Sequence, residues 1–433
     1  MSYTNNIVSP ALALPQGTHL RLQRAATPLS SREIWWINPG KCLLFLILPI
    51  YAISAWLGGP LMSEFGSTDF LTPTVILTGT LCIVCISIGC KAGEILSLHT
   101  SKSARISRRR FDRALLVLMF IAVTAHFLLL LNVLRNPQGM LAVIRGDQGA
   151  IYDVKDQLLK LVGLTSLVNI TPLVLAMASY RKILTGNPLS PRWRPLFWVL
   201  IAFVLVRGFA AAERLAIVEA AIGYALPVFT YGRRSWKGVG LFPLAGIAAV
   251  FMLFAVGEYT RSWAYYVDRY DNFLQFASLR LLGYISVASN TAAGLLDKFG
   301  SLGYPYFTAT WAIRLPELFG VTIDDPLEAY FAAFGNEEYN NPGGVMASVL
   351  DYGLVGGLIY CLAAGAFLGW FYGNYMKARP VGLFGYPCCF IGIAILTQGI
   401  YWGDPRFLTL ILAVALTVAY VSFPVRRQHS LAV

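Results

Sequence analysis

Long apolar runs recur along the chain and limit what it can fold into. A helix that crosses a bilayer needs about 20 mostly apolar residues. Ten stretches meet this description, roughly residues 41–58, 71–90, 114–134, 161–180, 194–210, 214–231, 239–256, 345–371, 381–400 and 407–425. Charged residues make up only 13% of the chain, against about 25% in soluble globular proteins. We therefore predict an all-α polytopic membrane protein with about ten transmembrane helices.

The distribution of basic residues predicts how these helices are oriented. If the N-terminus is cytoplasmic, the cytoplasmic segments hold 22 of the 34 Lys and Arg residues but only three of the 22 acidic residues. Lys and Arg concentrate in the cytoplasmic loops of membrane proteins. We therefore expect residues 1–40 and 426–433 to be cytoplasmic tails. The net charge of +12 is then explained by membrane anchoring, and we expect no nucleic-acid partner.

A long segment, 257–343, separates the seven predicted helices of 41–256 from the three of 344–425, and we expect it outside the cytoplasm. It contains the apolar stretch 273–296. As an ordinary span this stretch would place the later basic loops outside the cell. We therefore expect this stretch to form a helix that lies in the membrane interface or re-enters the membrane, with Arg280 facing the polar side. We expect short helices in the segment as a whole.

Arginine dominates the few basic residues of the predicted outer side, where it accounts for nine of twelve. Its planar guanidinium group can bind phosphate through two parallel hydrogen bonds. Snorkelling toward water and local ion pairs are the alternative roles for any one of them. The candidates for substrate binding are Arg207, Arg261, Arg269, Arg280 and Arg314.

The segment 257–343 is also rich in aromatic residues, with 18 in 87 residues compared with 13% for the whole chain. Aromatic rings stack on sugars, and they are equally common at membrane interfaces. Both roles remain open, and Trp263 is the aromatic residue that we select as a candidate substrate contact.

The sequence offers few catalytic groups on the outer side. No P-loop, G-x-S-x-G or H-E-x-x-H motif occurs, and no histidine is predicted there. A general base would therefore be a carboxylate such as Glu213 or Glu258. Asp324 and Asp325 could bind a divalent metal or could begin a short helix at Pro326. We predict no metal and no cofactor.

Three charged residues fall in or beside the apolar run 214–231. Glu213 and Arg214 open the run, and Glu219 lies about 7.5 Å further along the helix axis. Charges inside a bilayer are costly and usually face a cavity or a partner. We therefore expect Glu213 and Arg214 at the depth of the lipid headgroups, and Glu219 beside a cavity or an arginine.

Two stretches carry a resemblance to a known family. In "AERLAIVEAAIGYALPVFTYGRR" Arg214 opens a long apolar helix that ends in a basic turn, and Glu213 stands where the family usually has a small residue. In "NNPGGVMASVLDYGLVGGLIYCLAAGAFLGWFYGNYMK" Asn341 precedes a helix that contains Asp351 and Tyr352. Over roughly residues 200–425 the chain resembles the bacterial O-antigen polymerases, the Wzy-type polymerases of oligosaccharide repeat units.

The resemblance implies a GT-C-like glycosyltransferase of the bacterial inner membrane. Such an enzyme joins undecaprenyl-pyrophosphate-linked oligosaccharides at the periplasmic face, by transferring a growing chain to the non-reducing end of a new unit. It implies membrane lipid and a chain-length regulator protein as partners. It also implies that Arg214 binds the pyrophosphate, that Glu213 orients it or accepts a proton, and that Asn341, Asp351 and Tyr352 contact substrate.

Three alternative functions remain open. An O-antigen ligase uses the same donor but transfers the chain to the core of lipid A. Another GT-C glycosyltransferase would use a lipid-phosphate-linked sugar, and Asp324 and Asp325 would then be important. A lipid-linked oligosaccharide flippase or another transporter is the non-enzyme alternative.

Overall fold

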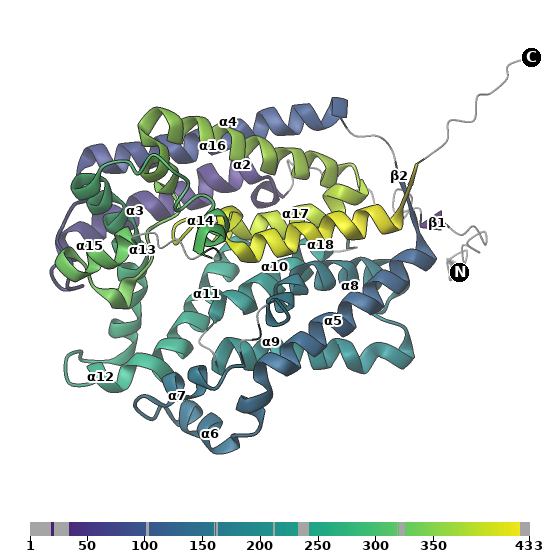
Figure 1. The fold of residues 1–433 in the computed structure, drawn as a ribbon, viewed down its shortest axis with the longest axis horizontal. Helices are drawn as coiled ribbons and strands as arrows, with labels where there is room; N and C mark the ends of the chain where they lie inside the picture. The colour runs from purple at the N-terminus through teal and green to yellow at the C-terminus, as the bar shows by residue number, and fades with distance from the viewer. Residues whose placement is uncertain are drawn as a thin grey trace, which may run out of the picture.

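The computed structural model describes residues 19–20 and 34–424, apart from 101–103, 160, 162, 211–212, 233–241, 318 and 320–324. The described chain is almost entirely helical (Figure 1). Its α-helices are α2 (Pro39–Cys42), α3 (Leu48–Gly58), α4 (Pro73–Thr100), α5 (Arg108–Leu134), α6 (Pro137–Arg145), α7 (Ala150–Asp156), α8 (Thr171–Thr185), α9 (Arg194–Ala210), α10 (Arg214–Tyr231), α11 (Phe242–Glu258), α12 (Ala264–Tyr266), α13 (Phe273–Phe299), α14 (Thr310–Glu317), α15 (Pro326–Phe334), α16 (Ala347–Met376), α17 (Pro380–Ala394) and α18 (Pro405–Val421).

Short turns of 3-10 or π-helix extend or connect these helices. They are η1 (Trp35–Ile37), η2 (Leu43–Ile47), η3 (Gly59–Leu61), η4 (Thr165–Ile170), η5 (Pro191–Trp193), η7 (Tyr259–Trp263), η8 (Glu337–Tyr339) and η9 (Tyr401–Gly403). The turn η7 continues α11 into α12, so one helical stretch leads from the bundle into the segment that was expected outside the cytoplasm.

Seven helical stretches of the described chain are long and apolar enough to cross a membrane. They are Pro39–Leu61, Pro73–His99, Arg108–Leu134, Thr165–Thr185, Arg214–Tyr231, Phe242–Tyr266 and Ala347–Met376. The other three expected spans, 194–210, 381–400 and 407–425, correspond to α9, α17 and α18, which have only 17, 15 and 17 residues. A polytopic membrane protein is thus confirmed, whereas the count of ten is not.

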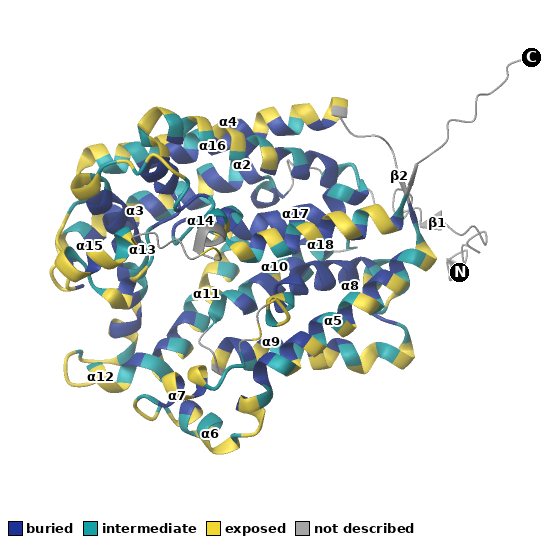
Figure 2. Cartoon of the chain, viewed as in Figure 1, coloured by how far each residue is buried: buried dark blue, intermediate teal, exposed yellow. Residues whose placement is uncertain are grey.

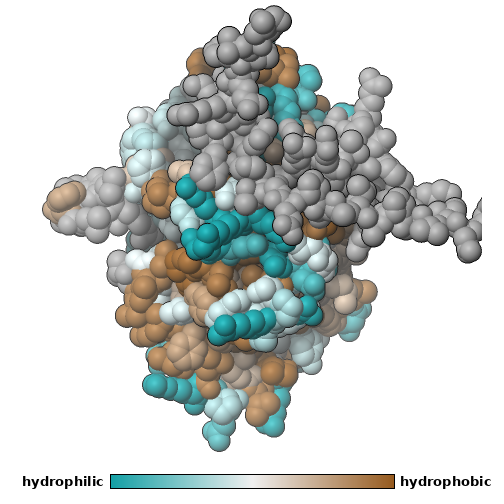
Figure 3. Space-filling view, turned by 90° about the vertical axis from the view of Figure 1, so that its right-hand side faces the viewer, coloured by the Kyte–Doolittle hydropathy of each residue, from teal (hydrophilic) through white to brown (hydrophobic). Residues whose placement is uncertain are grey.

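A small antiparallel sheet departs from the all-α expectation. Its order is β1-β2-β3, formed by β1 (His19–Leu20), β2 (Ala104–Ser107) and β3 (Ser422–Pro424). These segments are too short to show the alternating pattern that marks a strand in sequence. The strand β2 leads into α5 and β3 follows α18, so the sheet lies at one end of the bundle. On the face of the molecule turned toward the viewer in Figure 3, a cluster of hydrophilic residues borders a hydrophobic area.

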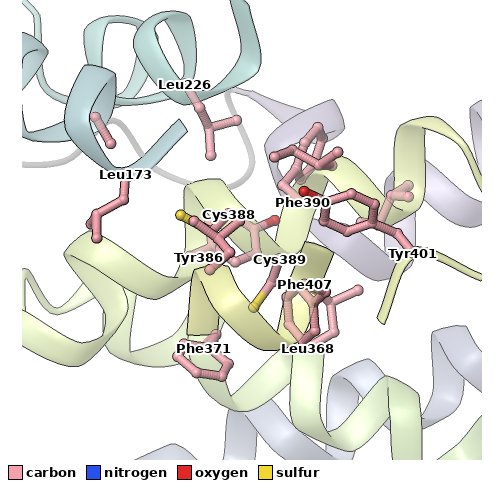
Figure 4. Packing of buried hydrophobic residues seen from close by; sticks show 14 of the residues in the cluster. Leu173, Leu226, Leu368, Phe371, Tyr386, Cys388, Cys389, Phe390, Tyr401 and Phe407 are labelled. Atoms are coloured by element: carbon pink, nitrogen blue, oxygen red, sulfur yellow. The ribbon is translucent and has the colours of Figure 1, made fainter. Parts of the chain in front are cut away.

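The centre of the bundle is formed by α8 and α17, whose residues are mostly buried (Figure 2). Aromatic, leucine and cysteine side chains interdigitate around α17 (Figure 4). The hydroxyl of Tyr180 on α8 donates a hydrogen bond to the carbonyl oxygen of Leu383 on α17 at 2.8 Å. The buried Tyr180 hydroxyl is therefore bonded to backbone, as is usual for polar groups in a low-dielectric interior.

Glycines allow α4 and α16 to pack with their backbones in contact. A Cβ atom on Gly93 would lie 1.9 Å from the carbonyl oxygen of Ala366, and one on Gly369 would lie 1.9 Å from that of Cys90. Close approach at small residues is the usual way in which membrane helices associate without a hydrophobic driving force. The helix α16 itself is kinked at Gly353, where φ is 70°.

The stretch 273–296 forms most of a single long helix, α13, and it does not meet the criteria for a membrane span. In Figure 1 α13 runs transverse to α16, α17 and α18. It is one helix of 27 residues, and the short helices α12, α14 and α15 lie before and after it in the same segment. The Arg280 side chain is only 5% exposed and pairs with the carboxylates of Glu258 and Glu338, and an interfacial or re-entrant position of α13 stays a prediction.

Several helices end on the side of the bundle away from the sheet, and we call this side the distal end. Here α5 ends at Leu134, α9 ends at Ala210 and α11 ends at Glu258. The helices α10 and α18 begin here, at Arg214 and Pro405. The distal end therefore collects the acidic and basic residues that the sequence places at the edges of its apolar runs.

Candidate anion-binding site

Two consecutive residues at the start of α10 belong to different ionic clusters. Glu213 is the N-cap residue of α10, and its Oε2 accepts a hydrogen bond from Nε of Arg207 at 2.6 Å. Arg214 is the first residue of α10, and its Nη2 forms an ion pair with Oε1 of Glu258. We call Arg207, Glu213 and Arg406 the Glu213 network, and Arg214, Glu258, Arg280 and Glu338 the Glu258 network.

The Glu258 network joins α10, α11, α13 and η8 through one buried carboxylate. Glu258 is the last residue of α11 and its side chain is 0% exposed. One of its oxygens pairs with Arg214 and the other accepts from Nε of Arg280 at 3.4 Å. Nη1 of Arg280 also lies 2.6 Å from Oε2 of Glu338. A buried carboxylate needs such partners because isolated charges are costly to bury. Glu258 therefore holds two guanidinium groups in fixed positions.

Aromatic rings surround the same arginines. The Arg214 guanidinium lies 4.5 Å from the ring centre of Phe254, and that of Arg280 lies 4.5 Å from the ring centre of Tyr339. Burial alone would lower the pKa of the Arg280 guanidinium, but Tyr339 and the carboxylates of Glu258 and Glu338 hold that pKa above its ordinary value. Arg280 therefore stays charged within the protein.

Arg261 adds a third arginine beside this network. Its Nε and Nη1 donate to the hydroxyl oxygens of Tyr152 and Tyr284 at 3.4 and 3.3 Å. No carboxylate of the described residues lies within ion-pairing distance of its guanidinium. Three guanidinium groups, those of Arg214, Arg261 and Arg280, therefore lie near two carboxylates, those of Glu258 and Glu338. This group of five side chains has one excess positive charge, which favours binding of an anion.

A cavity of about 150 Å³ opens beside Arg280. Hydroxyl, amide, charged and aromatic groups line it, which are the groups that bind sugars through hydrogen bonds and stacking. The exposed residue Arg269 lies on its wall, as do Tyr270 and Glu64. The full lining is Ser63, Glu64, Phe65, Gly66, Tyr266, Arg269, Tyr270, Phe276, Leu279, Arg280, Asn336 and Tyr339.

The Glu213 network joins the end of α9 to the starts of α10 and α18. The Arg207 side chain is 4% exposed, whereas those of Glu213 and Arg406 are 30% and 34% exposed. Nη2 of Arg207 lies 2.5 Å from Oε2 of Glu213, and Nη2 of Arg406 lies 3.9 Å from Oε1. The buried Arg207 therefore binds the Glu213 carboxylate closely, whereas the partly exposed Arg406 lies at the limit of ion-pairing distance from it.

Glu219 lies deeper in the bundle and is 2% exposed. It has no ion pair with a described residue, and its Oε1 has no hydrogen-bond partner at good geometry. Tyr401 is its hydrogen-bonding neighbour, and Arg207 and Arg406 are its electrostatic neighbours. The arginine neighbours expected from the sequence are thus present, although they do not form direct bonds with Glu219.

Asp351 and Tyr352 contact the protein's own backbone and side chains. Asp351 accepts hydrogen bonds from the N–H groups of Phe307 and Thr308, at 3.0 and 2.7 Å, and from Oγ1 of Thr308 at 2.6 Å. The Tyr352 hydroxyl lies 2.9 Å from the same Oγ1. These contacts fix the turn that precedes α14, and a role for either residue in substrate binding stays a prediction.

Asn341 is linked to the arginine cluster through one intermediate. Its Nδ2 donates to Oε1 of Gln398 at 2.9 Å, and Nε2 of Gln398 donates to the carbonyl oxygen of Tyr284 at 2.9 Å. Tyr284 is the residue whose hydroxyl accepts from Arg261. Asn341 therefore supports the helix that carries Arg280, and direct contact with substrate stays a prediction.

The remaining candidates have different outcomes. Trp263 packs against Phe273 and Phe276, with ring centres 5.5 Å apart in both cases. The side chain of Arg314 and all of Asp324 lie outside the described residues. Asp325 caps α15 by accepting from the N–H of Leu327 at 2.8 Å, which matches the helix-start interpretation of this acidic pair. The described residues contain no group of three His, Cys, Asp or Glu side chains placed to hold a metal ion.

Sequence reasoning did not select Glu338 or Arg406 as site residues. Glu338 follows α15 and Arg406 opens α18, so both lie far along the chain from the partners that define their roles. The only available signal was that each is a charged residue at the edge of an apolar helix.

Comparisons with family models, with curated proteins and with solved structures gave no match.

Proposed function

We propose that the chain is a glycosyltransferase that polymerises undecaprenyl-pyrophosphate-linked oligosaccharide repeat units into O-antigen or a related surface polysaccharide, at the periplasmic face of the inner membrane. The observation that carries the proposal is the surplus of arginine around Glu258 at the distal end. A diphosphate at the edge of a membrane requires fixed cations, and its lipid requires the apolar surface that the exposed side chains of α11 offer.

The reaction that this arrangement supports needs no nucleotide. A hydroxyl group of the acceptor sugar attacks the anomeric carbon of the donor, and the bond between that carbon and the diphosphate oxygen breaks. The lipid diphosphate leaves with the electron pair. At an effective dielectric constant of about 20, one guanidinium about 4 Å from a unit charge contributes roughly 4 kcal/mol of attraction before desolvation. Arginines that are fixed before the reaction can stabilise this leaving group.

The carboxylates of the site receive different roles in this proposal. Glu258 is completely buried between two guanidinium groups, so we assign it to positioning Arg214 and Arg280. The proton of the acceptor hydroxyl passes to a carboxylate that solvent and substrate can reach. Glu213, 30% exposed, is the candidate already favoured by its position next to Arg214.

Replacement of Arg214 tests the proposal. In a strain that lacks the chromosomal gene, Arg214→Ala should abolish polymer formation, and Arg214→Lys should restore it only partly because lysine keeps the charge but loses the planar fork. Arg145→Ala is the matched control, since Arg145 is an exposed arginine with no ion pair among the described residues. Normal polymer from well-expressed Arg214→Ala would contradict the proposal.

The alternatives predict different phenotypes. Loss of a polymerase leaves lipopolysaccharide capped with a single repeat unit. Loss of a ligase leaves lipopolysaccharide that carries no O-antigen. A flippase or transporter would need charged groups along a path through the bundle. The two ionic networks both lie at the distal end, and this favours an enzyme that acts at one face.

A further inference from the structure

We infer that Tyr152 and Tyr284 are positioning residues for phosphate binding, because they hold the Arg261 guanidinium group in place without neutralising its charge. The inference rests on the proposed function, which places a lipid diphosphate beside the Glu258 network. It adds the short helix α7, which carries Tyr152, to the elements that form the site.

The three arginines near Glu258 differ in the kind of partner that orients them. Arg214 forms an ion pair with Glu258, and Arg280 forms ion pairs with both Glu258 and Glu338. Arg261 donates instead to two phenol oxygens, at 3.4 and 3.3 Å. A carboxylate orients a cation and also cancels its charge, whereas a phenol hydroxyl is neutral and only orients it. Of the three, Arg261 therefore offers a ligand the charge that is least compensated.

The guanidinium group of Arg261 also keeps hydrogen-bond donors for a ligand. Nε donates to the Tyr152 hydroxyl and Nη1 to the Tyr284 hydroxyl, whereas Nη2 forms no hydrogen bond with a described residue. Both bonds are longer than the usual distance of about 3 Å, so the tyrosines restrain the side chain without binding it tightly. Nη1 and Nη2 together can then donate to two oxygens of one phosphate group.

The two tyrosines reach Arg261 from elements that are far apart in the sequence. Arg261 lies on η7, the π-helical turn that continues α11, and such turns are frequent at functional sites. The helices α6 and α7 contact η7 at the distal end (Figure 1). The turn between them passes close to η7, since a Cβ atom on Gly146 would lie 3.7 Å from the carbonyl oxygen of Tyr259. The α6–α7 hairpin therefore brings Tyr152 to the guanidinium group.

Tyr284 connects Arg261 to the other two arginines. Its ring centre lies 5.7 Å from the guanidinium carbon of Arg280 and 5.3 Å from the ring centre of Phe254. Phe254 is the residue whose ring packs against the Arg214 guanidinium. Removal of the Tyr284 ring would therefore disturb the whole cluster, and loss of its hydroxyl alone would affect Arg261.

Tyr152 allows a cleaner test because it has few other contacts. The residue is 45% exposed, and its hydrogen bond to Arg261 is the one that its hydroxyl forms with a described residue. Tyr265 is a matched control, since it is 51% exposed, lies on the neighbouring α12 and forms no hydrogen bond with a described residue. Replacing either hydroxyl should leave the fold unchanged.

The test measures binding of farnesyl diphosphate to the purified full-length protein in phosphatidylcholine nanodiscs. Tyr152→Phe should weaken binding roughly three- to tenfold, because the Arg261 side chain must then be ordered when the ligand binds. Tyr152→Glu keeps a hydrogen-bond acceptor but adds a negative charge, so it should weaken binding more than Tyr152→Phe does. Tyr265→Phe should bind like the wild type, and Tyr265→Glu should lose less affinity than Tyr152→Glu.

A double-mutant cycle shows whether Tyr152 acts through Arg261. Arg261→Ala should weaken binding by itself, and adding Tyr152→Phe to it should cause no further loss, because the two side chains act as one unit. A loss of equal size in both backgrounds would overturn the inference. Binding by Tyr152→Glu as tight as that of the wild type would also overturn it, because neutralising Arg261 would then not matter.

Two further outcomes separate the inference from the proposed function. Unchanged binding by Arg261→Ala, together with lost binding by Arg214→Ala, would overturn the role of the two tyrosines and leave the diphosphate site intact. No binding of farnesyl diphosphate to the wild type would overturn both.

Discussion

At the scale of single residues, Gly257 determines where the Arg214 guanidinium can lie. A Cβ atom on Gly257 would be 2.5 Å from Nε and 3.0 Å from Cζ of Arg214. The end of a flexible side chain yields more readily than a backbone, so Gly257→Ala should displace the guanidinium from Glu258 and leave the fold intact. Hydrogen bonds to charged groups contribute about 1.5–3 kcal/mol, so we expect farnesyl diphosphate binding to weaken roughly tenfold or more.

Gly246→Ala is the control for Gly257→Ala, because Gly246 is on the same helix and a Cβ there would meet no atom within 4 Å. Equal binding by both variants would show that Arg214 does not need its present position. Gly257→Ala should also unfold at a lower temperature than Gly246→Ala in the same detergent, because the buried Glu258 carboxylate loses one of its two cations.

Glu338 provides a second test at this scale. Its Oε2 accepts from Nη1 of Arg280 at 2.6 Å and from the Tyr266 hydroxyl at 2.8 Å. The side chain is 44% exposed, and exposed ion pairs contribute at most about 1 kcal/mol. Glu338→Gln should therefore reduce polymer synthesis by no more than about fivefold. Glu337→Gln, an exposed neighbour on the same turn, should have no effect, and a complete loss in Glu338→Gln would instead indicate direct participation in the reaction.

At the scale of helices and strands, the sequence predicts where an element lies more reliably than it predicts which elements contact each other. The span expected at 214–231 is confirmed as α10, because its apolar run has charged residues at its start and a basic turn after its end. The strand pairing of His19 with Ser107 could not be foreseen, since it depends on two distant segments meeting. The same reason hides Arg406, whose role depends on Glu213 almost two hundred residues earlier.

The contact between α4 and α16 gives a prediction about these elements. Gly93→Ala would force a methyl group against the carbonyl of Ala366, which is backbone and cannot move aside. The two helices must then separate, and overpacking of this kind typically costs about 1–3 kcal/mol. We expect a lower midpoint of thermal unfolding in detergent for Gly93→Ala than for Gly246→Ala. Equal midpoints would mean that the helices can separate at no cost.

At the scale of the whole molecule, the sheet and the ionic networks lie at opposite ends of the same bundle. The helix α5 runs from β2 to the distal end, and α18 runs from the distal end back to β3. The basic run that opens α5, Arg108 to Arg110, is thus at the end of the bundle where β2 lies. If basic residues mark the cytoplasmic side, the arginines of the Glu258 network face the periplasm, as the proposed reaction requires.

Labelling of single cysteines tests this orientation. Lys298 and Glu337 are exposed residues of the segment expected outside, and Arg109 is exposed at the sheet end. After replacement of the seven native cysteines, Lys298→Cys and Glu337→Cys should react with a membrane-impermeant maleimide on cells whose outer membrane has been opened. Arg109→Cys should react only after the inner membrane is lysed. The reverse pattern would place Arg214 and Arg280 in the cytoplasm, where no lipid-linked repeat units are polymerised, and would contradict the proposed function at its foundation.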